Sequence, residues 1–220
     1  MPEPTRLVLV RHGESNATVA RIIGGMRSCS GLSPLGVRQV EALRDRLLAT
    51  GELGTVDVLL SSTMPRALET ARILAPALGD LPVEAVDDLR EHDPGEADGL
   101  SFDEYVDRYG VPDFERDPYL PLSPGGESMA SFHLRAATAL HGLARAHAGA
   151  TLVVVCHGGI VDVALRSFLR LGVVGGFELW TRNTSLTELV QLESGRWRLA
   201  RYNDAAHLFG LPEATRAAGT

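Results

Sequence analysis

Two strongly apolar runs in this chain, residues 7–10 and 151–156, are each followed within two residues by a histidine and then a glycine. These histidines are His12 and His157. Short apolar runs that end at such a boundary are typical of strands buried inside a sheet. Since the carboxyl ends of parallel strands lie along one edge of a sheet, both histidines are expected to reach the same crevice.

Around these two runs, strand-like and helix-like segments alternate along the chain. Alternation at this spacing is typical of parallel βαβ units, so it predicts an α/β fold. We expect strands over residues 6–10, 56–60, 82–86, 151–156, 184–192 and 196–202. We expect helices over residues 34–49, 65–78, 101–109 and 128–148, and a last helix after the second histidine that ends near residue 171.

Two helix starts carry specific signals. Ser33 precedes Pro34, and serine at the N-cap with proline at the first helical position is favoured at a helix start. Ser101 is followed three residues later by Glu104, the spacing of a capping box. A short helical turn is also expected after Glu14.

Length and composition indicate an ordinary globular protein. With 220 residues, the chain is expected to form a single domain over 1–220, and the proline-rich range 87–127 is expected to be an insertion or lid. A net charge of −7 argues against nucleic-acid binding. Cys29 and Cys156 form no disulfide scaffold, and no stretch is long and apolar enough for a leader or a membrane span. We therefore expect a cytoplasmic protein without a membrane partner.

Further polar groups are expected at the same sheet edge. Ser62 ends the second strand, and Arg66 lies in the first turn of the helix that follows, where free backbone N–H groups and an arginine favour an anion. The loop after the third strand supplies Glu91. Histidines, arginines and one carboxylate suit phosphoryl transfer: arginine binds phosphate oxygens, imidazole attacks phosphorus, and a carboxylic acid protonates the leaving oxygen.

The ordered set of motifs resembles the histidine phosphatase superfamily, which includes the cofactor-dependent phosphoglycerate mutases. The resemblance covers about residues 5–208 and implies a three-layer α/β/α fold with a mostly parallel central sheet of about six strands. It rests on these motifs: Arg11-His12-Gly13-Glu14-Ser15, Ser61-Ser62 through Arg66-Ala67, Leu89-Arg90-Glu91 followed by Gly95 and Gly99, Pro124-Gly125-Gly126-Glu127-Ser128, and Cys156-His157-Gly158-Gly159.

The resemblance also implies a role for each matching residue. It makes His12 the nucleophile and Glu91 the proton donor, and it assigns the phosphoryl clamp to Arg11, Arg66 and His157. The remaining phosphate or substrate contacts that we expect are Gly13, Ser15, Asn16, Thr18, Arg90 and the backbone amide of Gly158.

Two positions depart from the pattern of the family. The family often has an asparagine six residues after the nucleophile, where this chain has Thr18, so Asn16 and Thr18 are both candidates for that phosphate contact. The family also often has an aromatic-acid pair before the second glycine after the donor, where this chain has Ala97-Asp98. The pocket wall is therefore expected to differ there.

Several functions are compatible with these residues. We favour a metal-independent phosphomonoester hydrolase that needs no cofactor and acts on a small phosphorylated metabolite. The alternatives are phosphoglycerate mutase-type phosphotransfer, an inactive phospholigand-binding module, and a metal site, which the adjacent arginines disfavour. Arg21, Arg27 and Arg90 either bind a second anionic group or are solvated. The hairpin over 184–202 offers an edge for a homodimer.

Overall fold

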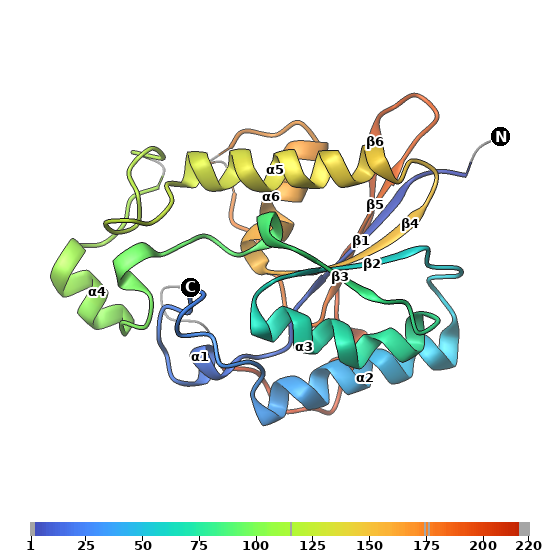
Figure 1. Cartoon of the computed structure of the whole chain (residues 1–220), viewed down its shortest axis with the longest axis horizontal. Coiled ribbons are helices and arrows are strands. Elements are labelled where there is room, and N and C mark those ends of the chain that lie inside the picture. Colours follow the sequence, from blue (N-terminus) through green and yellow to red (C-terminus); the bar gives the residue numbers. More distant parts are fainter. Residues whose placement is uncertain (1–2, 115, 174, 176, 216–220) are drawn as a thin grey trace.

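A six-stranded sheet forms the centre of the molecule, with the strand order β3-β2-β4-β1-β5-β6 (Figure 1). The computed structural model describes residues 3–114, 116–173, 175 and 177–215. The first four strands of that order are parallel, whereas β5 is antiparallel to both of its neighbours. The strands are β1 (Arg6–Arg11), β2 (Val58–Ser62), β3 (Val83–Val86), β4 (Thr151–Cys156), β5 (Leu186–Gln191) and β6 (Trp197–Asp204).

Helices cover both faces of the sheet, which confirms the expected three-layer α/β/α architecture (Figure 1). The helices are α1 (Asn16–Val19), α2 (Pro34–Thr50), α3 (Pro65–Leu74), α4 (Phe102–Tyr109), α5 (Met129–Ala146) and α6 (Gly158–Phe168). None of the helices in the described part of the chain is long and apolar enough to cross a membrane.

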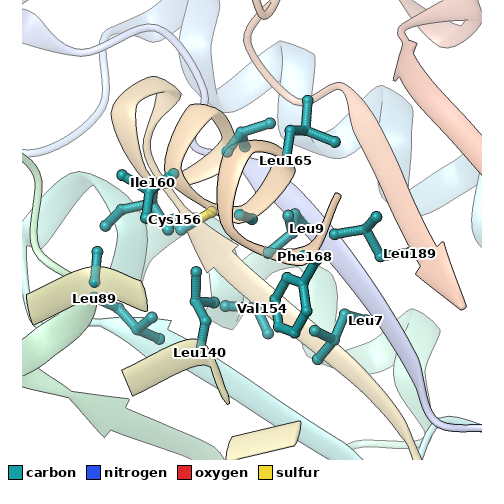
Figure 2. Packing of buried hydrophobic residues seen from close by; sticks show 14 of the residues in the cluster. Leu7, Leu9, Leu89, Leu140, Val154, Cys156, Ile160, Leu165, Phe168 and Leu189 are labelled. Carbon is teal, nitrogen blue, oxygen red and sulfur yellow. The ribbon is translucent and has the colours of Figure 1, made fainter. Parts of the chain in front are cut away.

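Each strand of the sheet's centre contributes to two cores because alternate side chains point to opposite faces. In β1, Val8 and Val10 pack with α2 and α3, whereas Leu7 and Leu9 pack with α5 and α6. Figure 2 shows the second of these cores, in which Phe168 of α6 lies against the sheet. All four of these apolar side chains are fully buried. Burial on both faces explains why this strand is an uninterrupted apolar run.

The helix starts follow the sequence signals. The Ser33 hydroxyl accepts a hydrogen bond from the Gly36 N–H, and Pro34 begins α2. Ser101 and Glu104 form both halves of a capping box at the start of α4. Ser15 caps α1, the helical turn expected after Glu14, by accepting from the Thr18 N–H.

Some boundaries differ from those expected. The helix expected over 65–78 leaves α-geometry after Leu74 and continues as a 3₁₀ turn, because Pro76 has no N–H for the helical ladder. β5 begins at Leu186 and not at 184, because Thr184 has a left-handed φ of +55°. β2 begins at Val58, after Asp57, whose carboxylate accepts the Thr151 N–H.

The range 87–127 contains α4 and two 3₁₀ turns, Asp87–Leu89 and Gly95–Ala97. It is tied to the loop that follows α1 through Asp98. The Asp98 carboxylate accepts hydrogen bonds from the backbone N–H groups of Gly25, Arg27 and Ser28. Burial raises the pKa of Asp98, but the Ser28 hydroxyl, which also donates to this carboxylate, and these backbone bonds outweigh it and hold the pKa below its usual value. The two segments therefore form one wall beside the sheet edge.

A close approach of two glycines fixes α2 against the segment that follows β1. A Cβ atom on Gly36 would lie 2.0 Å from the Glu14 carbonyl oxygen, and one on Gly13 would lie 2.6 Å from the Gly36 carbonyl oxygen. Neither distance is possible for non-bonded atoms, so both positions require glycine at this separation.

Candidate active site

His12 and His157 lie side by side at the carboxyl edge of the sheet. His12 follows β1 and His157 follows β4, and the two neighbouring strands are in register at their last residues, Arg11 and Cys156. The ring centroids of the two histidines are 5.0 Å apart, and both side chains are buried. Parallel pairing thus brings together two residues that are 145 positions apart.

The hydrogen bonds of His12 define its tautomer. Its Nδ1 lies 2.6 Å from the Gly13 carbonyl oxygen, which only accepts, so Nδ1 carries the proton. Its Nε2 accepts a hydrogen bond of 3.0 Å from the Nε–H of Arg66, so Nε2 carries the lone pair. Burial, and then the charges of Arg66 and Arg11, lower the pKa of His12 well below its ordinary value. The ring is therefore a neutral base.

The two ring nitrogens of His157 have different surroundings. Its Nε2 lies 2.8 Å from the Ser62 hydroxyl, which also accepts the Met64 N–H at 3.2 Å. Donation of the Ser62 hydroxyl proton to Nε2 would place the ring proton on Nδ1. That Nδ1 is buried and has no hydrogen-bond partner among the described residues. Burial, followed by the charge of Arg66, lowers the pKa of His157 well below its ordinary value.

The two arginines beside the histidines are also donors, and Arg66 is buried whereas Arg11 is partly buried. The Nη1 of Arg66 donates to the Gly24 carbonyl oxygen at 3.1 Å, and Arg11 donates from Nη1 to the carbonyl oxygen of Thr181. The Nε of Arg11 is buried and has no partner in the described part of the chain. Burial lowers the pKa of Arg11, which Glu91 opposes. A buried N–H of Arg11 and one of His157 are thus unsatisfied, as expected for an anion site.

Glu91 is held in place by backbone donors. Its Oε1 accepts the His92 N–H and its Oε2 accepts the Gly159 N–H, each at 3.0 Å. Arg135 of α5 supports the segment by donating to the carbonyl oxygen of Arg90 at 3.1 Å, while it forms an ion pair with Glu127 at 2.7 Å. These contacts place the Glu91 carboxyl beside the start of α6.

A cavity of about 390 Å³ opens over His12. Of the residues expected at the site, seven line it: Arg11, His12, Ser15, Thr18, Arg66, Glu91 and Gly158. His157 lies in contact with the His12 ring but behind this lining surface.

Three expected contact residues lie away from the cavity lining. The Gly13 N–H donates to the Thr70 hydroxyl at 3.2 Å, so the Gly13 amide bonds within the protein. The Asn16 side chain faces the Ser30 carbonyl oxygen at 3.4 Å, which leaves Thr18 as the one of the two asparagine-replacement candidates that lines the cavity. Arg90 forms an ion pair with Asp87 at 3.1 Å.

The sequence interpretation missed the segment that enters β5. Leu179, Trp180 and Thr181 line the cavity, and the side chain of Asn183 donates to the His12 carbonyl oxygen at 2.9 Å. A signal for this segment exists in the topology. Because β5 is antiparallel to β1, it begins at the edge where β1 ends, so the residues before it must lie at the site.

With the fold and the site described, comparison with known proteins gives the family. The model of the histidine phosphatase superfamily (branch 1) matches residues 7–205. The chain belongs to this superfamily. The match confirms the resemblance seen in the sequence motifs.

Both phosphatases and mutases are among its relatives. The metal-independent phosphoserine phosphatase of Arabidopsis thaliana is 30% identical over 94% of this chain and 84% of its own length. The 2,3-bisphosphoglycerate-dependent phosphoglycerate mutase of Methylobacterium sp. is 32% identical over 80% of this chain and 86% of its own. A phosphoserine phosphatase variant from Entamoeba histolytica, solved in complex with phosphoserine, is 25% identical with a TM-score of 0.76, covering 93% of this chain and 99% of that one.

Proposed function

We propose that this chain is a phosphomonoester hydrolase that forms a phosphohistidine on His12 and acts on a small phosphorylated metabolite. The observation that carries the proposal is the Nε2 lone pair of His12, which the Gly13 carbonyl oxygen and Arg66 fix between two arginines. A neutral imidazole in a cationic environment is a nucleophile matched to an anionic phosphoryl group. A cavity of about 390 Å³ suits a small metabolite.

The buried donors are placed to bind the phosphoryl oxygens. The Nε of Arg11 and the Nδ1 of His157 lack partners in the described structure, and a bound phosphoryl group would satisfy both. In the proposed complex, the Nε–H of Arg66 donates its hydrogen bond to a phosphoryl oxygen and no longer to His12. The lone pair of His12 Nε2 is then free to attack. Charge-assisted bonds of this kind also stabilise the charge that develops in the transition state.

The reaction then has two steps. His12 Nε2 forms a bond to phosphorus, the ester P–O bond breaks, and the leaving oxygen takes the proton of the Glu91 carboxylic acid. In the second step water attacks phosphorus while the Glu91 carboxylate removes its proton, and the P–N bond returns its electron pair to Nε2. The products are an alcohol and inorganic phosphate, and Glu91 is again protonated.

Phosphoglycerate mutase-type transfer is the second candidate, and the mutase relative is the observation that favours it. A mutase must hold its intermediate product while keeping water from the phosphohistidine. Two residues at the cavity mouth, Arg21 and Trp180, are exposed, and the Trp180 side chain is 56% accessible. An exposed mouth admits water, so hydrolysis is the better supported outcome.

A chromogenic phosphomonoester assay with and without a chelator tests the proposal. We expect turnover that survives chelation, together with an acid-labile phosphoprotein in quenched reactions. Both should vanish in His12→Ala. Turnover lost on chelation would contradict a metal-independent mechanism, and phosphoprotein that persists in His12→Ala would place the nucleophile elsewhere. Binding of phosphate without any turnover would indicate the inactive-module alternative.

A further inference from the structure

Three arginines near the site differ in what holds their side chains. Arg27 donates to the Gly95 carbonyl oxygen at 2.9 Å and lies 3.5 Å from the Asp98 carboxylate, and Arg90 is paired with Asp87. Arg21 has no side-chain hydrogen bond or ion pair within the described residues, and it lines the cavity over His12. Of the three, only Arg21 combines a free guanidinium with access to the cavity.

The backbone of Arg21 has a conformation that favours glycine. The Ile22 N–H bonds to the Ala17 carbonyl oxygen and the Arg21 N–H bonds to that of Thr18, each at 3.1 Å. This pair of bonds is the Schellman motif that ends α1, and it places Arg21 at the position with a left-handed φ, here +56°. Glycine occupies such positions without strain, whereas arginine does not. Helix termination therefore gives no reason for arginine here.

The neighbouring backbone keeps this position at the cavity mouth. The Ile23 N–H bonds to the Leu100 carbonyl oxygen at 2.8 Å, and the Gly99 N–H bonds to the Ile23 carbonyl oxygen at 2.9 Å. Strained residues that the surroundings hold in place cluster at ligand-binding sites. The Arg21 side chain is thus presented to the cavity from a fixed main chain.

The charges of the cavity separate into two groups. Arg11 and Arg66 lie beside His12, whose pKa both lower, and Glu91 is the acidic residue of the lining. Arg21 is the remaining charged residue of the lining, and it comes from the loop after α1, whereas Arg66 bonds directly to His12. Its charge is therefore available to a part of the ligand other than the phosphoryl group at His12.

We infer that Arg21 binds a second anionic group of the substrate, so that small phosphomonoesters bearing a carboxylate or a second phosphoryl group are preferred over neutral esters. This inference rests on the proposed hydrolase function. Arginine suits the task because its planar guanidinium binds either anion through two N–H groups.

The test compares phosphoglycolate with ethyl phosphate, two esters of nearly equal size that differ by the carboxylate. Released phosphate gives kcat/KM for each. We expect the wild-type chain to prefer phosphoglycolate about tenfold, the size of one charge-assisted hydrogen bond at a partly exposed site. Arg21→Gln and Arg21→Gly should bring that ratio close to one. A third ester, 1,2-ethanediol bisphosphate, distinguishes a carboxylate from a second phosphoryl group as the preferred anion.

Two controls separate recognition from structure. Arg27→Gln removes a cation from the same loop but outside the cavity lining, and it should keep the wild-type ratio. Arg21→Gly should have a Tm equal to or above that of the wild type, because glycine fits the left-handed position, whereas a structural role for Arg21 would lower the Tm.

The outcomes are distinct. Equal kcat/KM values of the anionic and neutral esters in the wild type, or a ratio that is unchanged in both Arg21 variants, would overturn the inference while leaving hydrolysis intact. A fall of the phosphoglycolate to ethyl phosphate ratio in Arg27→Gln would also overturn the inference, because the preference would then follow the net positive charge of the loop and not a contact with Arg21. Absence of turnover with every ester would instead contradict the proposed hydrolase function itself.

Discussion

The floor of the cavity and its rim are built by different means. The floor consists of Arg11, His12 and Arg66, with Ser62 and His157 directly behind them; strand ends and the first turn of a helix present these residues, and all of them except the partly buried Arg11 are buried. The rim consists of Arg21, Leu179 and Trp180, which come from the loops after α1 and before β5. The sheet itself fixes the floor, whereas local turns fix the rim. We therefore expect the floor to determine the chemistry and the rim to determine substrate choice.

Replacing Glu91, which faces the floor from the loop after β3, should have a larger effect on kcat than replacing Ser62 or Trp180. Glu91→Gln removes the proposed acid while keeping the shape, so kcat for an alkyl phosphate should fall by about 10² to 10⁴. The loss should be smaller with a nitrophenyl ester, whose leaving group needs no proton. Glu96→Gln, at an exposed carboxylate of the same segment, is the matched control. Equal losses on both esters would mean that another group donates the proton.

Ser62→Ala tests how the floor sets the tautomer of His157. Without the hydroxyl, Nε2 of His157 loses its donor, the proton is no longer confined to Nδ1, and binding of orthovanadate or phosphate should weaken about tenfold. Ser62→Thr should restore binding. Ser61→Ala is the control, because the Ser61 hydroxyl bonds to the Ser62 carbonyl oxygen and not to a histidine. A similar loss in Ser61→Ala would show that the effect is general damage to β2.

The buried histidines of the floor should also make stability depend on pH. Because the folded-state pKa of His12 is lowered, the unfolded chain binds more protons as the pH falls below 6.5, and the free energy of unfolding decreases. The asparagine in His12→Asn has no titratable proton, so this variant should reduce the slope, by an amount that approaches about 1.4 kcal/mol per pH unit once the pH is a unit or more below 6.5. Urea unfolding at pH 7.5 and at lower pH measures the slope. An unchanged slope would show that His12 titrates normally in the folded state.

Trp180→Ala at the rim should have the smallest effect. Tyr202 and Asn203 donate hydrogen bonds to the carbonyl oxygen of Trp180, so truncating the side chain leaves these two bonds intact. We expect KM to change by about twofold to fivefold for bulky esters, with kcat on a nitrophenyl ester nearly constant, since an exposed side chain contributes little binding energy. A large fall in kcat on the nitrophenyl ester would contradict the distinction between floor and rim.

Sequence patterns predicted the floor far better than the rim. An apolar run that is followed by a histidine indicates both a buried strand and the residue near its carboxyl end. The sequence alone therefore predicts that His12 and His157 lie at the same edge of the sheet. The partners of Arg66 and Arg11 at the rim are backbone carbonyl oxygens of Gly24 and Thr181. Any residue supplies a carbonyl oxygen, so no residue type marks such a contact in advance.

Arg90 shows a second limit. Its neighbour Glu91 reaches the cavity while Arg90 itself turns to Asp87, because the extended backbone at position 90 sends adjacent side chains in different directions. Arg21, in contrast, reaches the cavity because α1 ends in a left-handed residue. The sequence does not predict that turn, because the position has an arginine and not the glycine that normally indicates the end of a helix.

The paired glycines at 13 and 36 have a consequence for how this protein can diverge. Because the main chains touch there, a single methyl group on either residue would push α2 and the segment that follows β1 apart. Such a change would disable turnover without altering any group that meets the substrate. In a random mutational library, inactivating alleles should thus appear at both positions, whereas substitutions at Arg21 and Trp180 should survive with altered preferences. Substitutions in the loops can therefore produce new specificities, whereas the spacing between α2 and β1 tolerates no substitution at these two glycines.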